Sequence, residues 1–314
     1  MFRKLFDIEA IDGKWRIWTS IRKSKNKKRS RIIEPKKTRN KKPIIITVAI
    51  TVAACIAVVA VIVSKGRGPY TDEIAAIANA SVGDIVYWGS YEQDNDLENG
   101  TEPVAWYVLE KADGEATLLA VYLLDCQKYH EAWEDITWEN STLRSWLNSE
   151  FYNTAFSKEE QAAIVNTNVV NEDNPYWDTE GGNDTTDKVW LLSLGEIEKY
   201  FYIDMNDYDA YWNGNMSREE YAIYCYGKNN HVCAKPTAYA AAKGVGIYSE
   251  EWARYEMDNY GYDMSYAIGS GWWWLRSPGG SSYAAFVDCG GIVGYDGGLV
   301  DDNSGVRPAL KVAY

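Results

Sequence analysis

Cysteine and histidine, the side chains best suited to nucleophilic, redox and metal chemistry, are scarce in this chain of 314 residues. The two histidines, His130 and His231, lie in no HExxH motif, and no GxSxG motif marks a hydrolase serine. No CxxC motif is present, so a zinc site of that type is not indicated. Among the five cysteines, Cys225 and Cys233 are the closest candidates for a disulfide; the alternative is that the cysteines are unpaired and buried.

Carboxylates, in contrast, are abundant, with 45 Asp and Glu against 32 Lys and Arg. Two carboxylates facing each other across a groove would make a hydrolase of the glycosidase type, an alternative that the sequence leaves open. Within the oxygen-rich loop 171–187, Asp184 and Asp187 are predicted as weak metal ligands, with calcium as the only ion considered, because Ca²⁺ takes about six to eight oxygen ligands. The spacing is not that of an EF-hand, and the same side chains could instead cap turns before a strand at Val189.

The stretch 271–310 alternates short apolar runs with Gly, Ser, Asp and Tyr, as the strands and loops of a small sheet do. Tyrosine, serine and similar side chains suit recognition surfaces, because they offer rigid contact area and adaptable hydrogen bonds. We therefore predict a ligand-binding surface formed by Trp273, Ser281, Tyr283, Asp288, Tyr295, Asp296, Asp301 and Asn303.

Three consecutive tryptophans open this stretch. In a strand, Trp272 and Trp274 would share one face and Trp273 would take the other, because side chains alternate. One face would then be core and the other would line a pocket; the alternative is that all three rings are buried. Arg276 and Arg307 lie in otherwise uncharged motifs, and buried guanidinium groups need partners, so both are predicted to be structural anchors.

Charge and hydropathy divide the N-terminal part of the chain. Residues 1–43 hold 16 Lys and Arg against four acidic residues and are predicted to be a basic cytoplasmic tail. Residues 44–63, IIITVAITVAACIAVVAVIV, contain no charge, and a helix of this length spans roughly 30 Å, the thickness of a bilayer core. They are predicted to be a single transmembrane helix that partners the membrane. The tail is either a disordered topogenic segment or a membrane-surface segment, with no nucleic-acid partner expected.

Positive charge is concentrated before residue 44, which predicts a cytoplasmic N-terminus and an extracellular C-terminal domain at the cell membrane. After a stalk at 64–81, β-branched and aromatic runs at 84–91, 103–110 and 116–122 predict strands. Helical spacing and capping boxes then predict helices after residue 140, after Ser157 and after Ser193. Strands followed by helices and more short strands indicate an α+β domain at 82–314.

A set of segments distributed over residues 82–312 resembles a known family. The segments include VGDIVYWGSYEQD (82–94), PVAWYVL (103–109), GNDTTDKVWLLSLGE (182–196), WWWLRSPGG (272–280) and GVRPAL (305–310). Together they are similar to an uncharacterised bacterial extracellular domain family, which is similar in turn to C-type-lectin-like and formylglycine-generating-enzyme-like folds. The resemblance implies a mixed α+β core closed by C-terminal strands, with a binding surface on the loops between them.

These observations favour a membrane-anchored extracellular domain that recognises a protein or glycan without catalysis. The alternatives are an enzyme of the formylglycine-generating type, a hydrolytic cell-surface enzyme, or an envelope scaffold protein. Formylglycine-generating enzymes use two cysteines in a C-terminal segment, whereas the corresponding segment here holds only Cys289. No cofactor other than the calcium considered above is expected.

Overall fold

The computed structural model describes residues 8–11, 14–17, 70–202, 214, 230–261 and 264–314. The chain divides into two units, Met1–Ile62 and Val63–Tyr314. Within the first, β1 (Ile8–Ile11) and β2 (Lys14–Ile17) form an antiparallel hairpin. No helix in the described part of the chain is both long and apolar enough to span a bilayer. The predicted span at 44–63 and most of the predicted tail lie outside the described residues.

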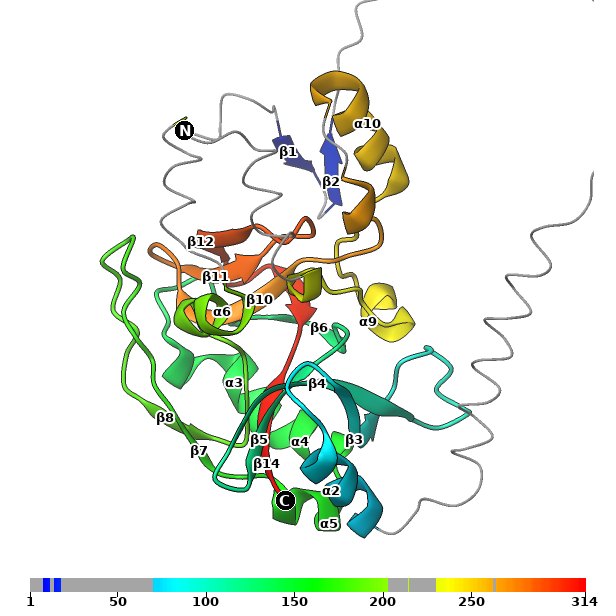
Figure 1. Ribbon diagram of the computed structural model, residues 1–314. Helices are drawn as coiled ribbons and strands as arrows, with labels where there is room; N and C mark the ends of the chain where they lie inside the picture. The colour runs from blue at the N-terminus through cyan, green and yellow to red at the C-terminus, as the bar shows by residue number, and fades with distance from the viewer. Residues whose placement is uncertain (1–7, 12–13, 18–69, 203–213, 215–229, 262–263) are drawn as a thin grey trace, which may run out of the picture. The chain divides into compact units, whose positions relative to one another are not determined.

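The second unit is built on two five-stranded sheets, which confirms the α+β class (Figure 1). The first sheet has the strand order β3-β4-β5-β14-β9. Its members are β3 (Ile85–Tyr91), β4 (Glu102–Ala112), β5 (Glu115–Ala120), β14 (Ala309–Ala313) and β9 (Val189–Trp190). All of its neighbouring strands are antiparallel.

The second sheet has the order β12-β11-β10-β13-β6. It consists of β12 (Val293–Leu299), β11 (Tyr283–Val287), β10 (Trp273–Pro278), β13 (Asn303–Val306) and β6 (Asp125–Lys128). Only Arg307 and Pro308 separate β13 from β14, so the C-terminal segment passes from the second sheet into the first (Figure 1). A further two-stranded sheet pairs β7 (Thr167–Val169) with β8 (Thr185–Asp187).

Short helices connect the strands, and local capping explains where several of them begin. Ser157 and Ser193 each form a complete capping box, with Glu160 and Glu196 respectively, at the starts of α5 and α6. The segment between β6 and β7, which includes α5, is largely helical. The helices are α2 (Tyr70–Asn79), η2 (Trp138–Asn140), α3 (Thr142–Trp146), η3 (Leu147–Phe151), α4 (Tyr152–Ala155), α5 (Lys158–Ala163), α6 (Leu194–Phe201), η4 (Asn230–Val232), α9 (Ala238–Ala242), α10 (Glu250–Tyr260) and η5 (Ser265–Ala267).

Two segments differ from expectation. Residues 245–268 are polar and lack clean periodicity, which predicts an ordered surface insertion or a long loop; the structure has an ordered helix there, α10, between a Ser249 N-cap and a left-handed Gly261. Capping at both ends compensates for the weak apolar face. The end of the predicted stalk also belongs to the folded domain, because Ile77 of α2 is fully buried in the core. The ammonium of Lys111 donates to three carbonyl oxygens at the C-terminal end of that helix.

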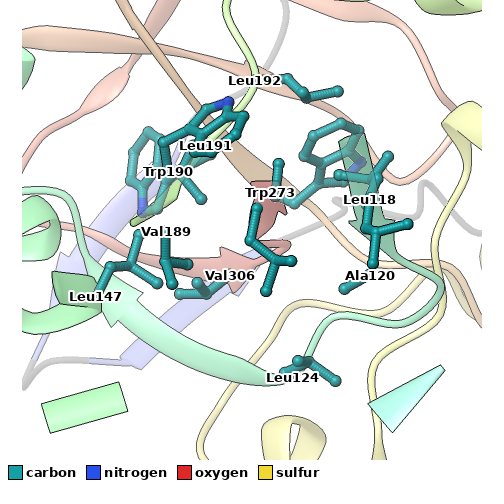
Figure 2. Close-up of a cluster of buried hydrophobic side chains, with 14 of the residues drawn as sticks. Leu118, Ala120, Leu124, Leu147, Val189, Trp190, Leu191, Leu192, Trp273 and Val306 are labelled. Atoms are coloured by element: carbon teal, nitrogen blue, oxygen red, sulfur yellow. The ribbon is translucent and has the colours of Figure 1, made fainter. Parts of the chain in front are cut away.

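The core is unusually rich in tryptophan. Figure 2 shows Trp190 and Trp273 among buried aliphatic side chains that include Leu118 and Val306. Buried indoles need an acceptor for their single N–H. Trp106 donates to the Trp88 carbonyl oxygen at 2.8 Å, and Trp274 donates to the Gln127 carbonyl oxygen at 3.0 Å. These bonds fix large side chains in place, so the strands that carry them hold a defined register.

Candidate functional site

The second sheet distributes the predicted ligand-binding residues between its two ends. Tyr283 at the start of β11 pairs with Leu299 at the end of β12, and Val287 pairs with Val293. Tyr283 and Val287 are therefore about 14 Å apart, at about 3.4 Å per residue. Ser281 and Tyr283 lie at one end, and Asp288 lies just beyond the other. They do not form a single surface.

At the first end, a loop from elsewhere in the chain joins the β10–β11 turn. Asp135, in the loop after β6, accepts hydrogen bonds from the hydroxyls of Ser281 and Ser282 at 2.6 and 2.8 Å. These hydrogen bonds hold the pKa of the Asp135 carboxyl below its ordinary value. Beside them Tyr283 is exposed, and the Asp135 loop also presents Trp133, with 68% of its surface exposed. We call Trp133, Asp135, Ser281, Ser282 and Tyr283 the tip surface.

Backbone hydrogen bonds hold the two loops of the tip surface together. The His130 amide donates to the Val300 carbonyl oxygen at 2.8 Å, and the Val300 amide donates to the Ser282 carbonyl oxygen at 3.2 Å. His130 also pairs with Glu134 at 3.0 Å. Predicted residue Asp301 follows Val300 directly. The carboxylates, hydroxyls and exposed aromatic rings of the tip surface thus lie on two loops and the start of β11, which these backbone hydrogen bonds hold together.

The last predicted residues of this region line the start of β13. Asn303 is exposed and pairs with Lys128 of β6. Asp302 lies between Asp301 and Asn303. Burial and the neighbouring Asp301 charge raise the pKa of Asp302, and the Lys128 charge partly offsets this rise. Asp301 and Asp302 thus place two neighbouring carboxyl groups at the margin of the tip surface.

At the opposite end, Asp288 closes the β11–β12 turn. Its carboxylate accepts from the Ile292 amide at 2.8 Å. Exposed Trp272 packs on Phe286, with ring centroids 4.9 Å apart. Asp288 therefore shapes a turn that lies at the far end of the sheet from the tip surface.

Three of the predicted ligand-binding residues have side chains that are wholly or partly buried: Trp273, Tyr295 and Asp296. Trp273 has no exposed surface, and its indole donates to the Val232 carbonyl oxygen at 3.2 Å. Tyr295 is buried and stacks on Tyr176 with ring centroids 4.3 Å apart. Burial raises the pKa of Asp296. The sheet packs on both faces here, so Trp273 and Trp274 of β10 are both buried, and of the three tryptophans only Trp272, which precedes the strand, is exposed.

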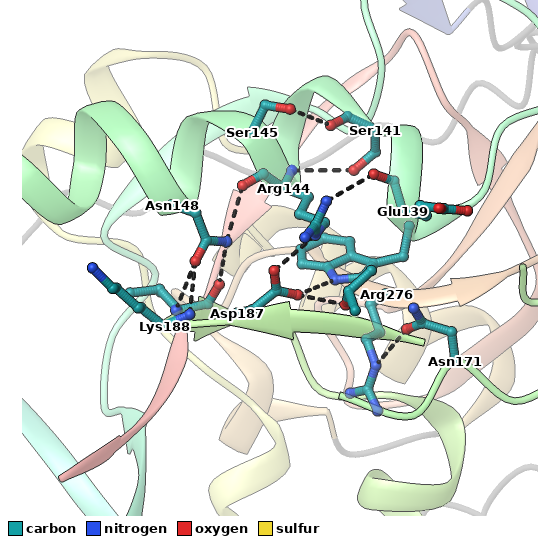
Figure 3. A network of polar contacts seen from close by, with 12 residues as sticks. Glu139, Ser141, Arg144, Ser145, Asn148, Asn171, Asp187, Lys188 and Arg276 are labelled. Atoms are coloured by element: carbon teal, nitrogen blue, oxygen red, sulfur yellow. Dashed lines mark hydrogen bonds and ion pairs between the residues drawn. The ribbon is translucent and has the colours of Figure 1, made fainter. Parts of the chain in front are cut away.

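Both arginines of the C-terminal stretch are buried among backbone carbonyls. Arg276 ion-pairs with Glu196 and donates to the carbonyl oxygens of Leu191 and Val170, at 2.9 and 2.8 Å. Its Nε donates to the Asn171 side chain (Figure 3).

Arg307 has no exposed surface and donates to the carbonyl oxygens of Ala120 and His231, at 2.9 and 2.8 Å. Its guanidinium also lies over the Trp273 ring, 5.0 Å from the centroid. Burial lowers the Arg307 pKa to about 10. Both arginines thus link segments that are distant in sequence.

The two predicted metal ligands are occupied by protein donors. Asp187 is buried and accepts from Arg144, Trp138 and Thr185 at 2.7, 2.9 and 2.7 Å (Figure 3). Asp184 accepts from the Asn171 amide at 3.0 Å. This geometry corresponds to the turn-capping and pairing alternative, and it leaves Asp187 no free oxygen facing solvent.

Sequence reasoning missed a different group of carboxylates. Glu92, Asp94 and Glu102 bring their oxygens within 4.8 Å of one another, the one such group among the described residues. Burial raises the pKa of Glu102, and the Asp94 and Glu92 charges add to this effect, against a hydrogen bond from the Gln93 amide. Local amide donors at Gln93 and Asn95 account for the loop's shape. The arrangement alone does not indicate a bound ion.

Residues 113–314 match DUF6273, a domain of unknown function. The chain belongs to the DUF6273 family. This confirms the expected membership of an uncharacterised domain family, while no link to C-type-lectin-like folds is shown. No curated protein and no solved structure gives a significant match.

The structure extends the DUF6273 domain beyond its matched residues. The match begins at Asp113, in the turn between β4 and β5. Strands β3 and β4 lie N-terminal to this turn but complete the first sheet. Their burial of Trp88 and Trp106 makes them part of the same core.

The cysteines of the DUF6273 domain give little support to thiol chemistry. Cys126, Cys233 and Cys289 are thiols in the described residues. Burial raises the pKa of Cys126 to about 11 and that of Cys289 to about 12. Both are protonated at neutral pH, and a thiol rather than a thiolate is a poor nucleophile. The predicted Cys225–Cys233 disulfide lies partly outside the described residues.

Proposed function

We propose that this DUF6273 protein is a non-catalytic recognition protein that captures an extracellular protein or glycan through the tip surface. The observation that carries the proposal is the junction of Asp135 with Ser281 and Ser282, which unites two loops far apart in sequence. Exposed Trp133 and Tyr283 flank this junction. Aromatic side chains beside fixed polar groups are typical of binding surfaces, since they give large contacts at low entropic cost.

The proposed fold is C-type-lectin-like. In its support, β14 near the C-terminus lies between β5 and β9 and completes the first sheet. The hairpins of the second sheet then present the loops of the tip surface. This is the arrangement that the family resemblance implies, a mixed core closed by C-terminal strands.

Ligand capture provides the test of the tip surface. Full-length protein would be screened on arrays of glycans and bacterial surface proteins, with Trp133→Ala/Tyr283→Ala as the test variant. We expect capture to fall at least about tenfold, the effect of removing a hot-spot side chain, with an unchanged melting temperature. Tyr87→Ala is the matched control, because Tyr87 is an exposed tyrosine on the first sheet.

Two outcomes would contradict this assignment. Undiminished capture by the double variant would place the binding surface elsewhere, and a large drop in melting temperature would show that the two aromatic residues are structural. If wild-type protein captured nothing, an envelope scaffold would be the better description.

We also propose that residues 44–63 anchor the protein in the cell membrane, with the tail cytoplasmic and the domain extracellular. The charge-free run and its basic N-terminal flank support this topology. Protease added to intact cells is expected to digest the C-terminal domain and leave an epitope tag at the N-terminus protected. Digestion of the tag with the domain intact would reverse the topology.

A further inference from the structure

A groove of about 620 Å³ lies between helix α2 and strand β3, and none of the tip-surface residues lines it. Residues of α2 that include Asp72 and Glu73 line one side, and residues 84–87 line the other. A groove over one face of a sheet is lined by every second residue of a strand, because side chains alternate between the faces. Lining by four consecutive residues therefore indicates that this groove runs along the edge of β3.

β3 is an edge strand, because in the described part of the chain only β4 pairs with it. The Val108 amide donates to the Asp84 carbonyl oxygen at 2.9 Å, so the backbone groups of Asp84 point toward β4. Successive residues of an antiparallel strand point their N–H and C=O groups to opposite sides. The backbone groups of Ile85 and Tyr87 therefore point away from β4, on the side of the groove.

Side chains cover two other sheet edges. On β9, the Asn148 side chain donates to the Val189 carbonyl oxygen at 2.8 Å and accepts from the Val189 amide at 3.2 Å. On β12, the Asn174 side chain donates to the Tyr295 carbonyl oxygen at 2.8 Å. Among the described residues, no side-chain or loop hydrogen bond reaches the backbone of Ile85 or Tyr87. An uncovered edge of this kind is a template for pairing with another chain.

The length of the regular edge limits what can pair with it. The register between β3 and β4 shifts after Tyr87, so the regular edge extends over residues 84–87. At about 3.3 Å per residue, this edge is roughly 13 Å long and accommodates about four residues of an extended peptide.

The side chains of the groove determine the charge of a suitable partner. Asp72 and Asp84 are exposed, Glu73 is half-buried, and no Lys or Arg lines the groove. Exposed Ile85 and Ala76 add apolar surface on the two sides. A partner with basic and apolar side chains complements this lining. A second copy of the chain is a poor match, because it would bring the same carboxylates into the contact.

We propose that this groove binds an extended basic peptide of another protein, which adds a strand to the edge of β3. The peptide backbone exchanges hydrogen bonds with Ile85 and Tyr87. Its Lys or Arg side chains face the carboxylates of Asp72, Glu73 and Asp84. In this mode of recognition the main-chain hydrogen bonds provide affinity and the side chains provide specificity. The site is separate from the tip surface and does not rest on the proposed function.

Fluorescence anisotropy with two synthetic peptides tests the choice of partner. Full-length protein would be titrated against labelled, terminally blocked peptides in which Val alternates with Lys or with Glu. We expect the lysine peptide to bind at least about tenfold tighter than the glutamate peptide. Its affinity should fall as the NaCl concentration rises from about 0.05 to about 0.5 M, because salt screens the charges. Equal binding of the two peptides would overturn the proposal.

Backbone methylation of the peptide separates strand addition from attraction between charges alone. One version of the lysine peptide is N-methylated at every Lys and the other at every Val. Alternate amides of an extended peptide point to opposite sides, so only one version loses its hydrogen bonds to β3. We expect the affinities of the two versions to differ by at least about tenfold. Equal affinities would show that no strand is added.

Protein variants test the same contact from the other side. Ile85→Pro removes an N–H that points into the groove, and edge strands tolerate proline where the N–H faces outward, so peptide affinity should fall about tenfold. Alanine keeps the N–H, so Ile85→Ala is the matched control and should retain most of the affinity, as should Tyr87→Ala. If Ile85→Pro fails to fold, the methylated peptides still decide the question. Equal losses in folded Ile85→Pro and Ile85→Ala would contradict strand addition.

Asp72→Asn tests the acidic side of the groove. We expect it to weaken lysine-peptide binding about threefold, the size of one exposed ion pair. Asp258→Asn is the matched control, because Asp258 is an exposed aspartate of α10 that does not line the groove. A dimer of the wild-type protein that Ile85→Pro dissociates would make a second copy the occupant and overturn the proposal. Failure of peptide binding with intact capture at the tip surface would leave the proposed function standing.

Discussion

Replacement of Asp187 by alanine is expected to lower the free energy of unfolding by about 3 kcal/mol, or about 10 °C in melting temperature. The Asp187 carboxylate is buried, and it accepts hydrogen bonds from Arg144, Trp138 and Thr185 (Figure 3). Its removal leaves Nε of Arg144 and the buried indole N–H of Trp138 without their acceptor. The partial exposure of Arg144 limits the penalty, because water can solvate part of its charge.

Asp184→Ala is the matched control for this measurement. Asp184 is an exposed aspartate three residues away that accepts one backbone hydrogen bond, so its loss should cost only about 1 kcal/mol. Thermal unfolding of both variants, with and without EDTA, separates the two roles considered for Asp187. A wild-type melting temperature that falls in EDTA, and an Asp187→Ala value that does not, would favour a calcium ligand over a structural pair.

Alkaline pH is expected to destabilise the domain through the cluster around Asp125. This buried carboxylate accepts from the Tyr91 hydroxyl at 2.7 Å and pairs with Lys243 at 2.6 Å. Burial and the Asp125 charge raise the pKa of Tyr91 well above its ordinary value. Burial lowers the pKa of Lys243, but its hydrogen bond and ion pair with Asp125 outweigh this effect and raise it.

The sign of the effect follows from proton binding in the two states. Above about pH 10 the unfolded chain releases the protons of Tyr91 and Lys243, whereas the folded chain retains them. Their stabilising contribution is therefore complete below about pH 10. Above it, the proton retained by buried Tyr91 lowers the stability by about 1.4 kcal/mol per pH unit, whereas solvent screening makes the contribution of the more exposed Lys243 smaller.

Denaturant unfolding from pH 7 to 11 checks this prediction. Tyr91→Phe should lose about 1.5 kcal/mol at pH 7 through the missing hydrogen bond and should show a shallower alkaline decline. Tyr122→Phe is the control, since Tyr122 is exposed. Equal alkaline slopes for wild type and Tyr91→Phe would show that Tyr91 does not retain its proton in the folded state.

Local chemistry in the sequence was sufficient to predict several elements. The capping boxes at Ser157 and Ser193 require partners only three residues away, so a short stretch of sequence is enough to recognise them. The turn at Asp113 and Gly114 is similar, since both residues adopt the left-handed conformation that tight hairpins need. By the same reasoning, the α+β class followed from the order of strand-like and helix-like segments.

The candidate site, in contrast, was decided by tertiary structure. Asp135 meets Ser281 across 146 residues, and no periodic pattern in the loop that carries Asp135 signals that contact. Alternation predicted that Trp273 would face opposite to Trp272 and Trp274, but only the packing of both sheet faces determined that Trp273 and Trp274 are buried and Trp272 is exposed. Capping and turn preferences act over a few bonds, so the sequence determined them directly. The partner of a buried charge or ring depends on strand order and register, which only the assembled sheets define.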